Sequence, residues 1–233
     1  MLTEEQGEWA ARLRATGLRP PYALGCILRF LLKPNAEVRQ LLSGLERELH
    51  APGSVAIGVH IRFTDGTVWE GEGEDGPKQL SEGEVERLKQ VARPLLQCAQ
   101  SLEDWWFAPP LEVRWLIITN SLHFKLAMHH EYQNKVVSTP FTPRHSNKLS
   151  DNAISTNATL EVVAADITAY QELVADWLLL STCHSFVVPR SGYSRTAAFF
   201  SLRPNSVFSV ETGFCDPEGP VNMFNLAHSW SGL

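Results

Sequence analysis

The sequence lacks the features that would place the protein in a membrane or in a nucleic-acid complex. A membrane-spanning helix needs about 18 consecutive apolar residues, and the longest apolar-rich stretch, residues 22–32, is shorter and interrupted by Arg29. The first residues lack the basic start and apolar run of a secretory signal. The net charge of −6 gives no basic excess for nucleic acid or anionic membranes. We therefore expect any anionic ligand to be bound locally, by a few arginines and helix N-termini.

Cysteine is also scarce, with four residues in a chain of 233. Cys26, Cys98, Cys183 and Cys215 stand far apart and form neither a CxxC pair nor the spacing of a zinc site. We expect four buried thiols, because free cysteine is among the most buried residue types. The alternative is up to two disulfides, in one of three pairings.

The order of strand and helix patterns predicts an α/β fold with a Rossmann-like, mainly parallel sheet flanked by helices. Apolar, β-rich runs predict strands at 54–62, 113–119, 135–138, 185–188 and 207–210. Helical patterns separate them, at 81–100, 121–133, 167–180 and 194–202. We expect a single domain over residues 1–233, with a helical lead-in at 1–50, the Rossmann-like core at 54–210 and a tail at 211–233.

Local signals define several boundaries within this pattern. Asn35 is expected to cap a helix over 36–49, and Ser81 and Glu84 form a capping box before the helix over 81–100. In the lead-in, helical patterns cover 3–16 and 23–32. The acidic, glycine-rich segment 70–77 is expected to be a solvent loop, as are the residues around Trp105 and Trp106.

The first group of polar residues ends the predicted strand 54–62. The Arg62 guanidinium can bind two phosphate oxygens at once and stays charged at any relevant pH. His60 lies two positions earlier and therefore points to the same side of the sheet. The structural alternative is an arginine paired with Asp65 and a histidine satisfied within the core.

The second group follows the predicted strand 185–188 and precedes an alanine-rich helical start. Ser191, Gly192, Tyr193 and Ser194 would place a hydroxyl and exposed backbone amides at a helix N-terminus, which favours an anion. Gly192 lets the backbone approach a ligand closely. The structural alternative is that Ser194 is only a helix cap and Gly192 only a turn residue.

Two segments resemble motifs of the fucosyltransferase superfamily, which includes α1,6-, α1,2- and protein O-fucosyltransferases. Residues 57–65 resemble the first motif, a strand that ends in His-x-Arg and is followed by threonine or glycine and then by aspartate. Residues 176–198 resemble the later motif, in which Asp176 precedes the serine turn at Ser191 by fifteen residues. The two motifs in this order are more specific than either alone.

The resemblance implies one half of a GT-B-type architecture with GDP-fucose as the donor substrate. His60 and Asp176 would then lie at the guanine, while Arg62 would bind the pyrophosphate and act as the catalytic residue. Family members stabilise the leaving diphosphate with arginine and backbone amides, and this chain has no DxD motif, so no metal and no other cofactor is implied. The candidate substrate-binding residues are His60, Arg62, Asp65, Asp176, Ser191, Gly192, Tyr193 and Ser194.

The resemblance leaves two functions open. The first is an inverting transfer of fucose from GDP-fucose to a hydroxyl of a glycan or glycoprotein acceptor, an activity that family members mostly perform in the secretory lumen. The alternative is a catalytically inactive nucleotide-sugar-binding or interaction module. Asn120 favours the alternative, because the family's middle strand commonly has an aspartate at this place. We also expect a missing amino-terminal acceptor domain or a partner chain, since 233 residues leave little room for that domain.

Overall fold

The computed structural model describes residues 20–63, 72–73, 76–77, 80–107, 110–141, 160–189, 191–203, 206–209 and 215. Five strands form one sheet in which every neighbouring pair is parallel, so the expected Rossmann-like α/β fold is confirmed. These strands are β1 (Ser54–Ile61), β4 (Glu112–Thr119), β5 (Val136–Val137), β6 (Ser185–Val188) and β7 (Val207–Ser209).

The sheet order, β5-β4-β1-β6-β7, places the first strand in the middle. The chain moves outward from β1 through β4 to β5, and α7 (Leu160–Thr182) then returns it to the other side of β1, where β6 and β7 are added. The winding direction therefore reverses between β1 and β6. In doubly wound sheets, ligands bind at the carboxyl ends of the strands that flank such a reversal.

The two central strands are buried along most of their length. β1 and β4 pair in register from Ser54 opposite Glu112 to Ile61 opposite Thr119. β1 needs a glycine at position 58, because a Cβ atom there would lie 2.5 Å from the Leu180 Cδ1 atom of α7. This close contact of α7 with β1 brings the helix that carries Asp176 against the sheet.

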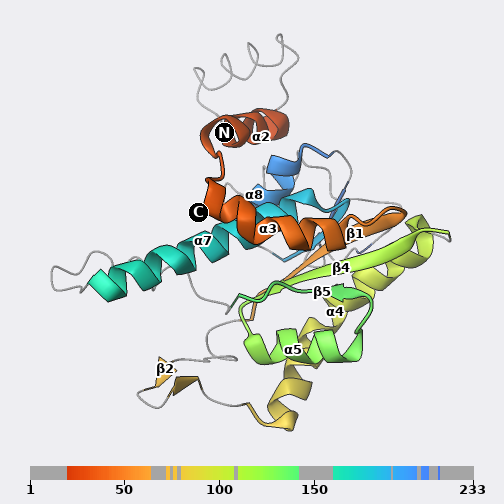
Figure 1. Cartoon of the computed structure of the whole chain (residues 1–233). Helices are drawn as coiled ribbons and strands as arrows, with labels where there is room; N and C mark the ends of the chain where they lie inside the picture. Colours follow the sequence, from red (N-terminus) through yellow and green to blue (C-terminus); the bar gives the residue numbers. More distant parts are fainter. Residues whose placement is uncertain are drawn as a thin grey trace, which may run out of the picture.

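Helices cover both faces of the sheet (Figure 1). On one face lie α3 (Ala36–Leu49), α7 and α8 (Gly192–Ser201), which share a core with the even-numbered side of β1. On the opposite face lie α4 (Glu82–Trp106) and α5 (Leu122–Glu131), which pack on Ile57, Val59 and Ile61. The side chains of His60 and Arg62 follow the even-numbered side, so the α7 and α8 face is the one that concerns the candidate site.

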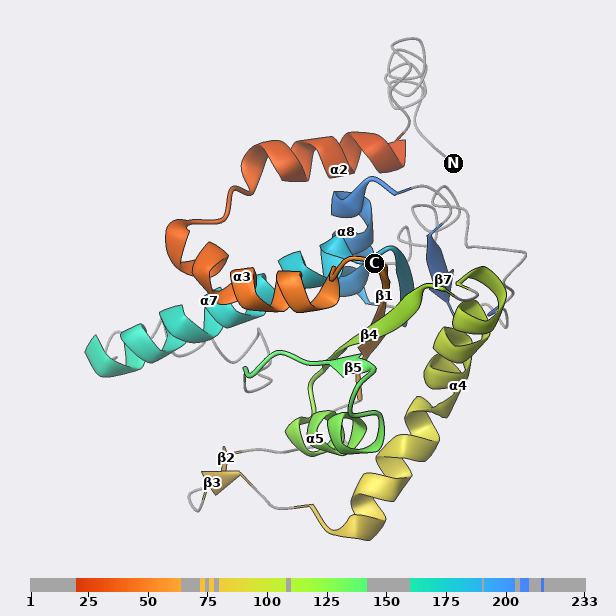
Figure 2. The same cartoon turned by 45° about the vertical axis from the view of Figure 1, so that its right-hand side comes forward.

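The lead-in helix α2 (Pro20–Leu31) packs on the outer side of α8 (Figure 2). The Arg29 Nε atom donates a hydrogen bond to the Phe200 carbonyl oxygen at 2.7 Å, and its guanidinium lies 5.4 Å from the centre of the Phe200 ring. Helix α2 therefore packs against α8 and stabilises it, and the first turn of α8 follows β6.

The predicted helix caps are confirmed. The Asn35 side chain accepts a hydrogen bond from the Val38 backbone N–H at 2.9 Å. Ser81 and Glu84 form the reciprocal capping box at the start of α4. These local signals act within one turn, which is why the sequence alone locates these helix starts.

Several boundaries differ from the sequence-based expectation. Helix α4 continues to Trp106 instead of ending near residue 100, so the two tryptophans belong to the helix and not to a loop. Helix α7 starts at Leu160, seven residues before the predicted position 167. The segment expected to be a solvent loop contains a short antiparallel pair, β2 (Glu72–Gly73) and β3 (Gly76–Pro77). The predicted helix over 3–16 lies outside the described residues, as does the tail except for Cys215.

The expectation of four buried thiols is wrong. Cys98 of α4 and Cys215 form a disulfide across 117 positions of sequence, with their Cα atoms 5.2 Å apart. Cys183 is a buried thiol, and Cys26 is exposed. The sequence could not reveal this pairing, because it depends on the fold bringing Cys215 to Cys98 of α4.

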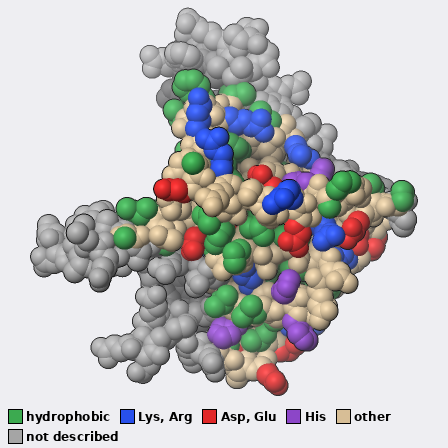
Figure 3. All heavy atoms as spheres, viewed as in Figure 1, with side chains coloured by type: hydrophobic (Ala, Val, Ile, Leu, Met, Phe, Trp, Pro, Cys, Tyr) green, Lys and Arg blue, Asp and Glu red, His purple; other side chains and the backbone are tan. Residues whose placement is uncertain are grey.

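The described surface is polar and mixed in charge. On the face drawn in Figure 3, many of the basic side chains lie in the upper part of the view, and acidic side chains are spread mainly below them. Among the described residues, no helix combines the length and the apolar character needed to cross a bilayer.

Candidate functional site

His60 lies at the carboxyl end of β1, where the winding direction of the sheet reverses. The side chain is 6% exposed and its ring lies 5.4 Å from the ring of Tyr193, at the start of α8. The buried Nδ1 atom has no hydrogen-bond partner among the described residues. Burial lowers the pKa of the imidazole to about 3, and the nearby Arg62 charge acts in the same direction. His60 is therefore neutral at physiological pH and presents an unsatisfied polar atom.

Arg62 follows directly after β1 and is exposed. Its effect on the His60 pKa shows that the guanidinium lies within electrostatic reach of the imidazole. An exposed guanidinium at the edge of a buried site can meet an anionic ligand without a large cost of desolvation.

Asn120 fixes the backbone next to these residues. Its Oδ1 atom accepts a hydrogen bond from the Phe63 N–H at 2.9 Å, and its Nδ2 atom donates to the Phe63 carbonyl oxygen at 3.0 Å. Both ends of the amide are thus used to join the ends of β1 and β4. An aspartate could accept the first bond but could not donate the second, which gives a physical reason for asparagine at this place.

The N-terminus of α8 lies next to His60 and contributes the second part of the candidate site. Ser191 occupies the N-cap position in an extended conformation and makes no side-chain capping hydrogen bond. Gly192, the first helical residue, is exposed, and the first helical hydrogen bond is donated by the N–H of residue 195 to the Ser191 carbonyl. The amide groups of this first turn are therefore oriented as in the helix N-termini that bind anions.

Neighbouring side chains hold this first turn in place. The Trp177 indole N–H donates to the Tyr193 carbonyl oxygen at 3.1 Å and to the Thr196 hydroxyl at 3.0 Å. The Ser194 hydroxyl is fully buried and donates to the Ser191 carbonyl at 3.5 Å. These hydrogen bonds stabilise the first turn of α8, and the Ser194 hydroxyl is used within that turn.

Tyr193 connects α8 to α7 and to β1. Its hydroxyl donates to the Leu173 carbonyl oxygen at 3.0 Å, and its ring faces His60. Burial and the nearby Asp176 charge raise the pKa of the phenol, so the hydroxyl stays protonated. Its ring is therefore the part of Tyr193 that contacts His60.

Asp176 lies on α7 and has a second unsatisfied buried atom. Its Oδ1 atom has no hydrogen-bond partner among the described residues, while the carboxylate accepts a hydrogen bond from the Thr139 hydroxyl. Burial raises the pKa of Asp176 to about 6, against the opposing influence of the Lys125 charge and the Thr139 hydrogen bond. At neutral pH the carboxylate is mostly ionised and carries one free acceptor.

Lys125 and Thr139 complete this end of the sheet, and the sequence analysis missed both. Lys125 is 5% exposed, and its Nζ atom donates to the Thr139 hydroxyl at 2.8 Å and to the Phe141 carbonyl at 2.9 Å. The signal that could have found them is position: Lys125 lies in the first turns of the helix after β4, and Thr139 lies two residues after β5. Strand ends of a parallel sheet meet at one edge.

The structure brings six of the eight predicted residues to this end of the sheet: His60, Arg62, Asp176, Ser191, Gly192 and Tyr193. Ser194 lies within the first turn of α8 with its hydroxyl directed to Ser191. Asp65 lies outside the described residues. Among the described residues, no group of three histidine, cysteine or acidic side chains is arranged to hold a metal ion.

The arrangement combines two kinds of recognition. Arg62 and the α8 N-terminus offer positive charge and N–H donors, which suit a phosphate or diphosphate. Asp176 offers a buried acceptor and His60 a buried neutral nitrogen, which suit the polar edge of a flat ring. Together these groups fit a ligand that joins a heterocyclic base to a diphosphate.

Comparison with known proteins shows where this fold occurs. No protein-family model and no curated protein sequence matches the chain. Among solved structures, a mutant of Arabidopsis thaliana FUT1 in complex with GDP is similar, with a TM-score of 0.50 and 12% identity over 82% of this chain and 36% of that chain. NodZ α-1,6-fucosyltransferase co-crystallised with GDP gives a TM-score of 0.41 and 17% identity over 70% of this chain.

The chain spans 41% of the NodZ chain and thus less than half of its length. At these identities the similarity concerns the fold, which agrees with the fold that the sequence motifs suggested. The described part of this chain therefore has an α/β fold similar to that of part of the FUT1 structure.

Proposed function

We propose that this chain is a donor-binding unit that holds GDP-fucose at the carboxyl ends of β1 and β6 and takes part in fucosyl transfer. The observation that carries the proposal is the pair of unsatisfied buried atoms, His60 Nδ1 and Asp176 Oδ1, in two residues that both lie near Tyr193. Leaving a buried polar atom unpaired costs about 1–3 kcal/mol, so two of them at a topological reversal indicate a ligand that pairs them.

The base of the donor would lie against Asp176 and His60. Guanine presents adjacent N–H donors on one edge, and an ionised carboxylate accepts such donors well. His60, neutral because of its burial, can pair with a ring atom without adding charge. Adenine lacks this pair of adjacent donors, so Asp176 gives a physical basis for preferring guanine.

The diphosphate would lie between Arg62 and the first turn of α8. In an inverting transfer, an acceptor hydroxyl attacks C1 of fucose, the bond from C1 to the diphosphate oxygen breaks, and negative charge grows on GDP. Arg62 and the backbone N–H groups of Gly192 and Tyr193 would stabilise that charge as it develops. In this proposal Arg62 is the catalytic residue and no metal is required.

A second function, binding of the nucleotide sugar without transfer, is favoured by Asn120. Both ends of its amide are engaged by the Phe63 backbone. Asn120 therefore provides no acid or base at a position where a carboxylate could serve. The surface that would bind the acceptor is not assigned to the described residues, because the chain spans less than half of the similar NodZ structure.

Calorimetric titration with GDP and GDP-fucose, followed by an assay for fucose released from the donor, separates these functions. Binding with turnover, in the presence of a glycan or glycoprotein acceptor, supports the transferase. Binding without turnover supports the module. No binding of GDP at millimolar concentration contradicts both functions.

Substitution of Arg62 tests the diphosphate contact. Arg62→Ala should weaken GDP binding by about tenfold or more, because a hydrogen bond to a charged group contributes about 1.5–3 kcal/mol. Arg62→Lys should also weaken it, since an ammonium cannot replace the two-pronged contact. Arg87→Ala, which removes an exposed arginine of α4, is the matched control and should leave binding unchanged.

A further inference from the structure

A second cavity lies on the opposite face of the sheet, between α4, β4 and α5. Its volume is about 330 Å³, near the lower limit of known small-molecule pockets. Its lining comes mainly from α4, which contributes Glu86, Lys89, Arg93, Leu96, Gln97 and Gln100. Trp115 of β4 forms its inner end, and Met128, Glu131 and Tyr132 close it on the α5 side. None of these residues belongs to the site at the carboxyl ends of β1 and β6.

The inner part of this cavity is apolar except for one atom. Trp115, Met128 and Leu96 line it, and Trp115 is only 1% exposed. The buried Nε1 atom of Trp115 has no hydrogen-bond partner among the described residues. An indole N–H normally finds a hydrogen-bond acceptor when it is buried. The missing acceptor at Trp115 in the described part of the chain is a feature that a bound ligand would explain.

The outer part of the cavity carries planar polar groups. Gln97 offers an amide, Arg93 a guanidinium and Glu86 a carboxylate, whereas the Gln100 amide already donates to Asp104 at 2.9 Å and accepts from Lys135 at 3.4 Å. The ring of Tyr132 stands 5.5 Å from that of Trp115 and supplies an aromatic face. Amides, carboxylates and guanidinium groups form paired hydrogen bonds, which match neighbouring hydroxyls on a ring.

The walls are tied together before any ligand arrives. Lys89 of α4 and Glu131 of α5 form an ion pair at 2.6 Å. Lys135 pairs with Glu103 at 2.5 Å and lies 4.4 Å from the centre of the Trp115 ring. These contacts hold α4, α5 and Trp115 in a fixed relation, which lowers the entropy cost of binding.

The charges of the lining exclude several ligand classes. Two cations, Lys89 and Arg93, are balanced by two carboxylates, Glu86 and Glu131, so the cavity favours neither an anion nor a cation. The ring of polar groups disfavours a purely apolar ligand, because binding it would leave them without water or partners. A neutral ring with several hydroxyls satisfies both conditions.

We infer that this cavity is a binding site for one ring of a neutral saccharide. The apolar side of the sugar ring would lie on Tyr132, and hydroxyls would bond to Gln97, Arg93 and Glu86. The Trp115 indole N–H would donate to a ring substituent at the bottom of the cavity. This site is independent of the proposed nucleotide site and takes a different class of ligand.

The test is nuclear magnetic resonance of the protein with ¹⁵N-labelled tryptophan indoles. The probes are the methyl glycosides of glucose, galactose and N-acetylglucosamine, with sodium sulfate as the anionic comparison. At least one glycoside should shift the Trp115 indole resonance in a saturable way, with a dissociation constant on the order of 1 mM. The resonance of Trp177, which already has two acceptors, should stay in place. The Trp115→Phe variant assigns the resonance.

If Trp115→Phe fails to fold, substitutions of residues at the rim of the cavity still test the proposal. Gln97→Leu should weaken glycoside binding at least about tenfold, because Gln97 lies on the exposed rim and contributes paired hydrogen bonds. Gln90→Leu, at an exposed position of α4 outside the lining, should have no effect. The inference is wrong if none of the three glycosides shifts Trp115, if sulfate shifts it instead, or if both variants behave alike. GDP titration of the same samples shows separately whether the nucleotide site is intact.

Discussion

Two histidines of the same sheet differ in how their Nδ1 atoms are satisfied. At the amino end, the His184 Nδ1 atom accepts a hydrogen bond from the Ala56 N–H at 3.0 Å, and the His184 backbone N–H donates to the Ala56 carbonyl at 2.8 Å. At the carboxyl end, the Nδ1 atom of His60 is buried without a partner among the described residues. The first arrangement closes the fold, whereas the second leaves a polar atom for a ligand.

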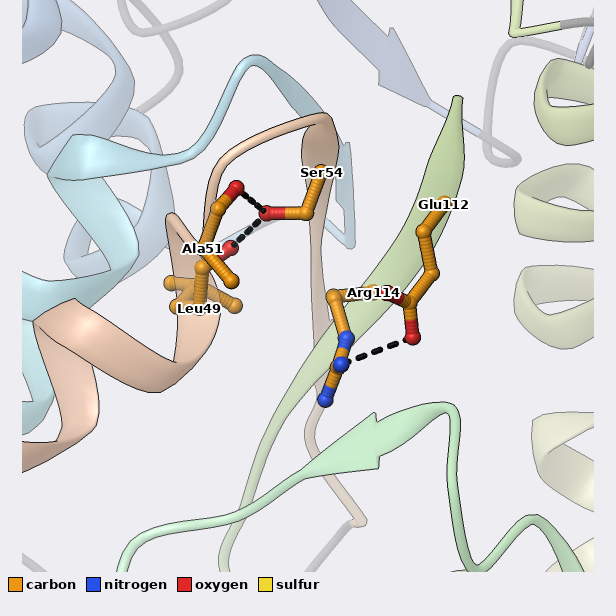
Figure 4. Close-up of polar contacts among 5 residues, drawn as sticks. All are labelled: Leu49, Ala51, Ser54, Glu112 and Arg114. Atoms are coloured by element: carbon orange, nitrogen blue, oxygen red, sulfur yellow. Dashed lines mark hydrogen bonds and ion pairs between the residues drawn. The ribbon is translucent and has the colours of Figure 1, made fainter. Parts of the chain in front are cut away.

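Other groups repeat the contrast between the two ends. At the amino end, the Ser54 hydroxyl lies 3.1 Å from the Leu49 carbonyl oxygen and 2.7 Å from that of Ala51 (Figure 4). In the same region the Nη2 atom of Arg114 pairs with Glu112 at 2.7 Å, whereas its buried Nε atom has no hydrogen-bond partner among the described residues. At the carboxyl end, Asp176 keeps one carboxylate oxygen without a partner among the described residues. The contrast between the two ends therefore holds for Ser54 and His184 against His60 and Asp176, and it does not extend to every polar group.

Removing the His184 imidazole should give the largest loss of stability. His184→Phe leaves the Ala56 N–H buried without its acceptor, and we expect the free energy of unfolding to fall by about 2 kcal/mol. GDP affinity should stay unchanged, because the substitution lies at the far end of the strands. Denaturant unfolding and calorimetry measure the two effects. A loss of GDP binding in a folded His184→Phe protein would break the separation between the two ends.

Acid should weaken GDP binding through Asp176. The pKa of this carboxyl is raised to about 6 by burial, so protonation begins near neutrality. If the guanine donates to the ionised form, the affinity for GDP should fall about tenfold from pH 7 to pH 5, equivalent to about 1.4 kcal/mol. Asp176→Asn should bind GDP weakly and with a flatter pH profile. An affinity that is equal at pH 7 and pH 5 would contradict the role of Asp176.

Asn120→Asp tests a carboxyl-end side chain whose amide is engaged at both its donor and its acceptor. The substitution removes the donor to the Phe63 carbonyl oxygen and should lower the free energy of unfolding by about 1 kcal/mol. Asn120→Ala removes both hydrogen bonds and should cost more. If Asn120→Asp is as stable as the native protein, the asparagine has no structural advantage at this place.

The smallest effect concerns the pH dependence of stability. Burial lowers the pKa of His184 to about 4, below its value in the unfolded chain. Between these two values the unfolded state binds more protons, so the stability contributed by neutral His184 is complete at pH 7 and is lost as the pH falls toward 4. The loss of stability between pH 7 and pH 5 should therefore be smaller in His184→Phe than in the native protein. Equal losses would show that His184 does not titrate across this range.

The sequence predicts the sheet well because its signals are local or periodic. The continuous apolar runs of β1 and β4 and the capping box at Ser81 all lie within a few residues. The end of α4 and the start of α7 were misplaced, because tertiary packing extends helices beyond their local signals. The Cys98–Cys215 disulfide was missed for the same reason, since it depends on contacts between distant segments.

The candidate site was predictable in part. The motif around His60 and Arg62 and the turn at Ser191 mark the two strand ends, and the fold brings them together. Lys125 and Thr139 could not be found from motifs, because each is an ordinary residue until the fold brings them to Asp176 at the carboxyl edge of the sheet. The role of Asn120 also depends on three-dimensional structure, since Phe63 is its partner only after β1 and β4 pair.

The central claim is that the carboxyl end keeps buried polar atoms for GDP at no benefit to the fold. It is tested most directly by measuring GDP affinity and the free energy of unfolding together in His60→Phe. We expect GDP affinity to fall by about tenfold or more, since a paired buried group contributes about 1–3 kcal/mol, while the protein is as stable as the native chain or more stable. A His60→Phe protein that binds GDP with native affinity, or that loses stability as His184→Phe does, would contradict the claim.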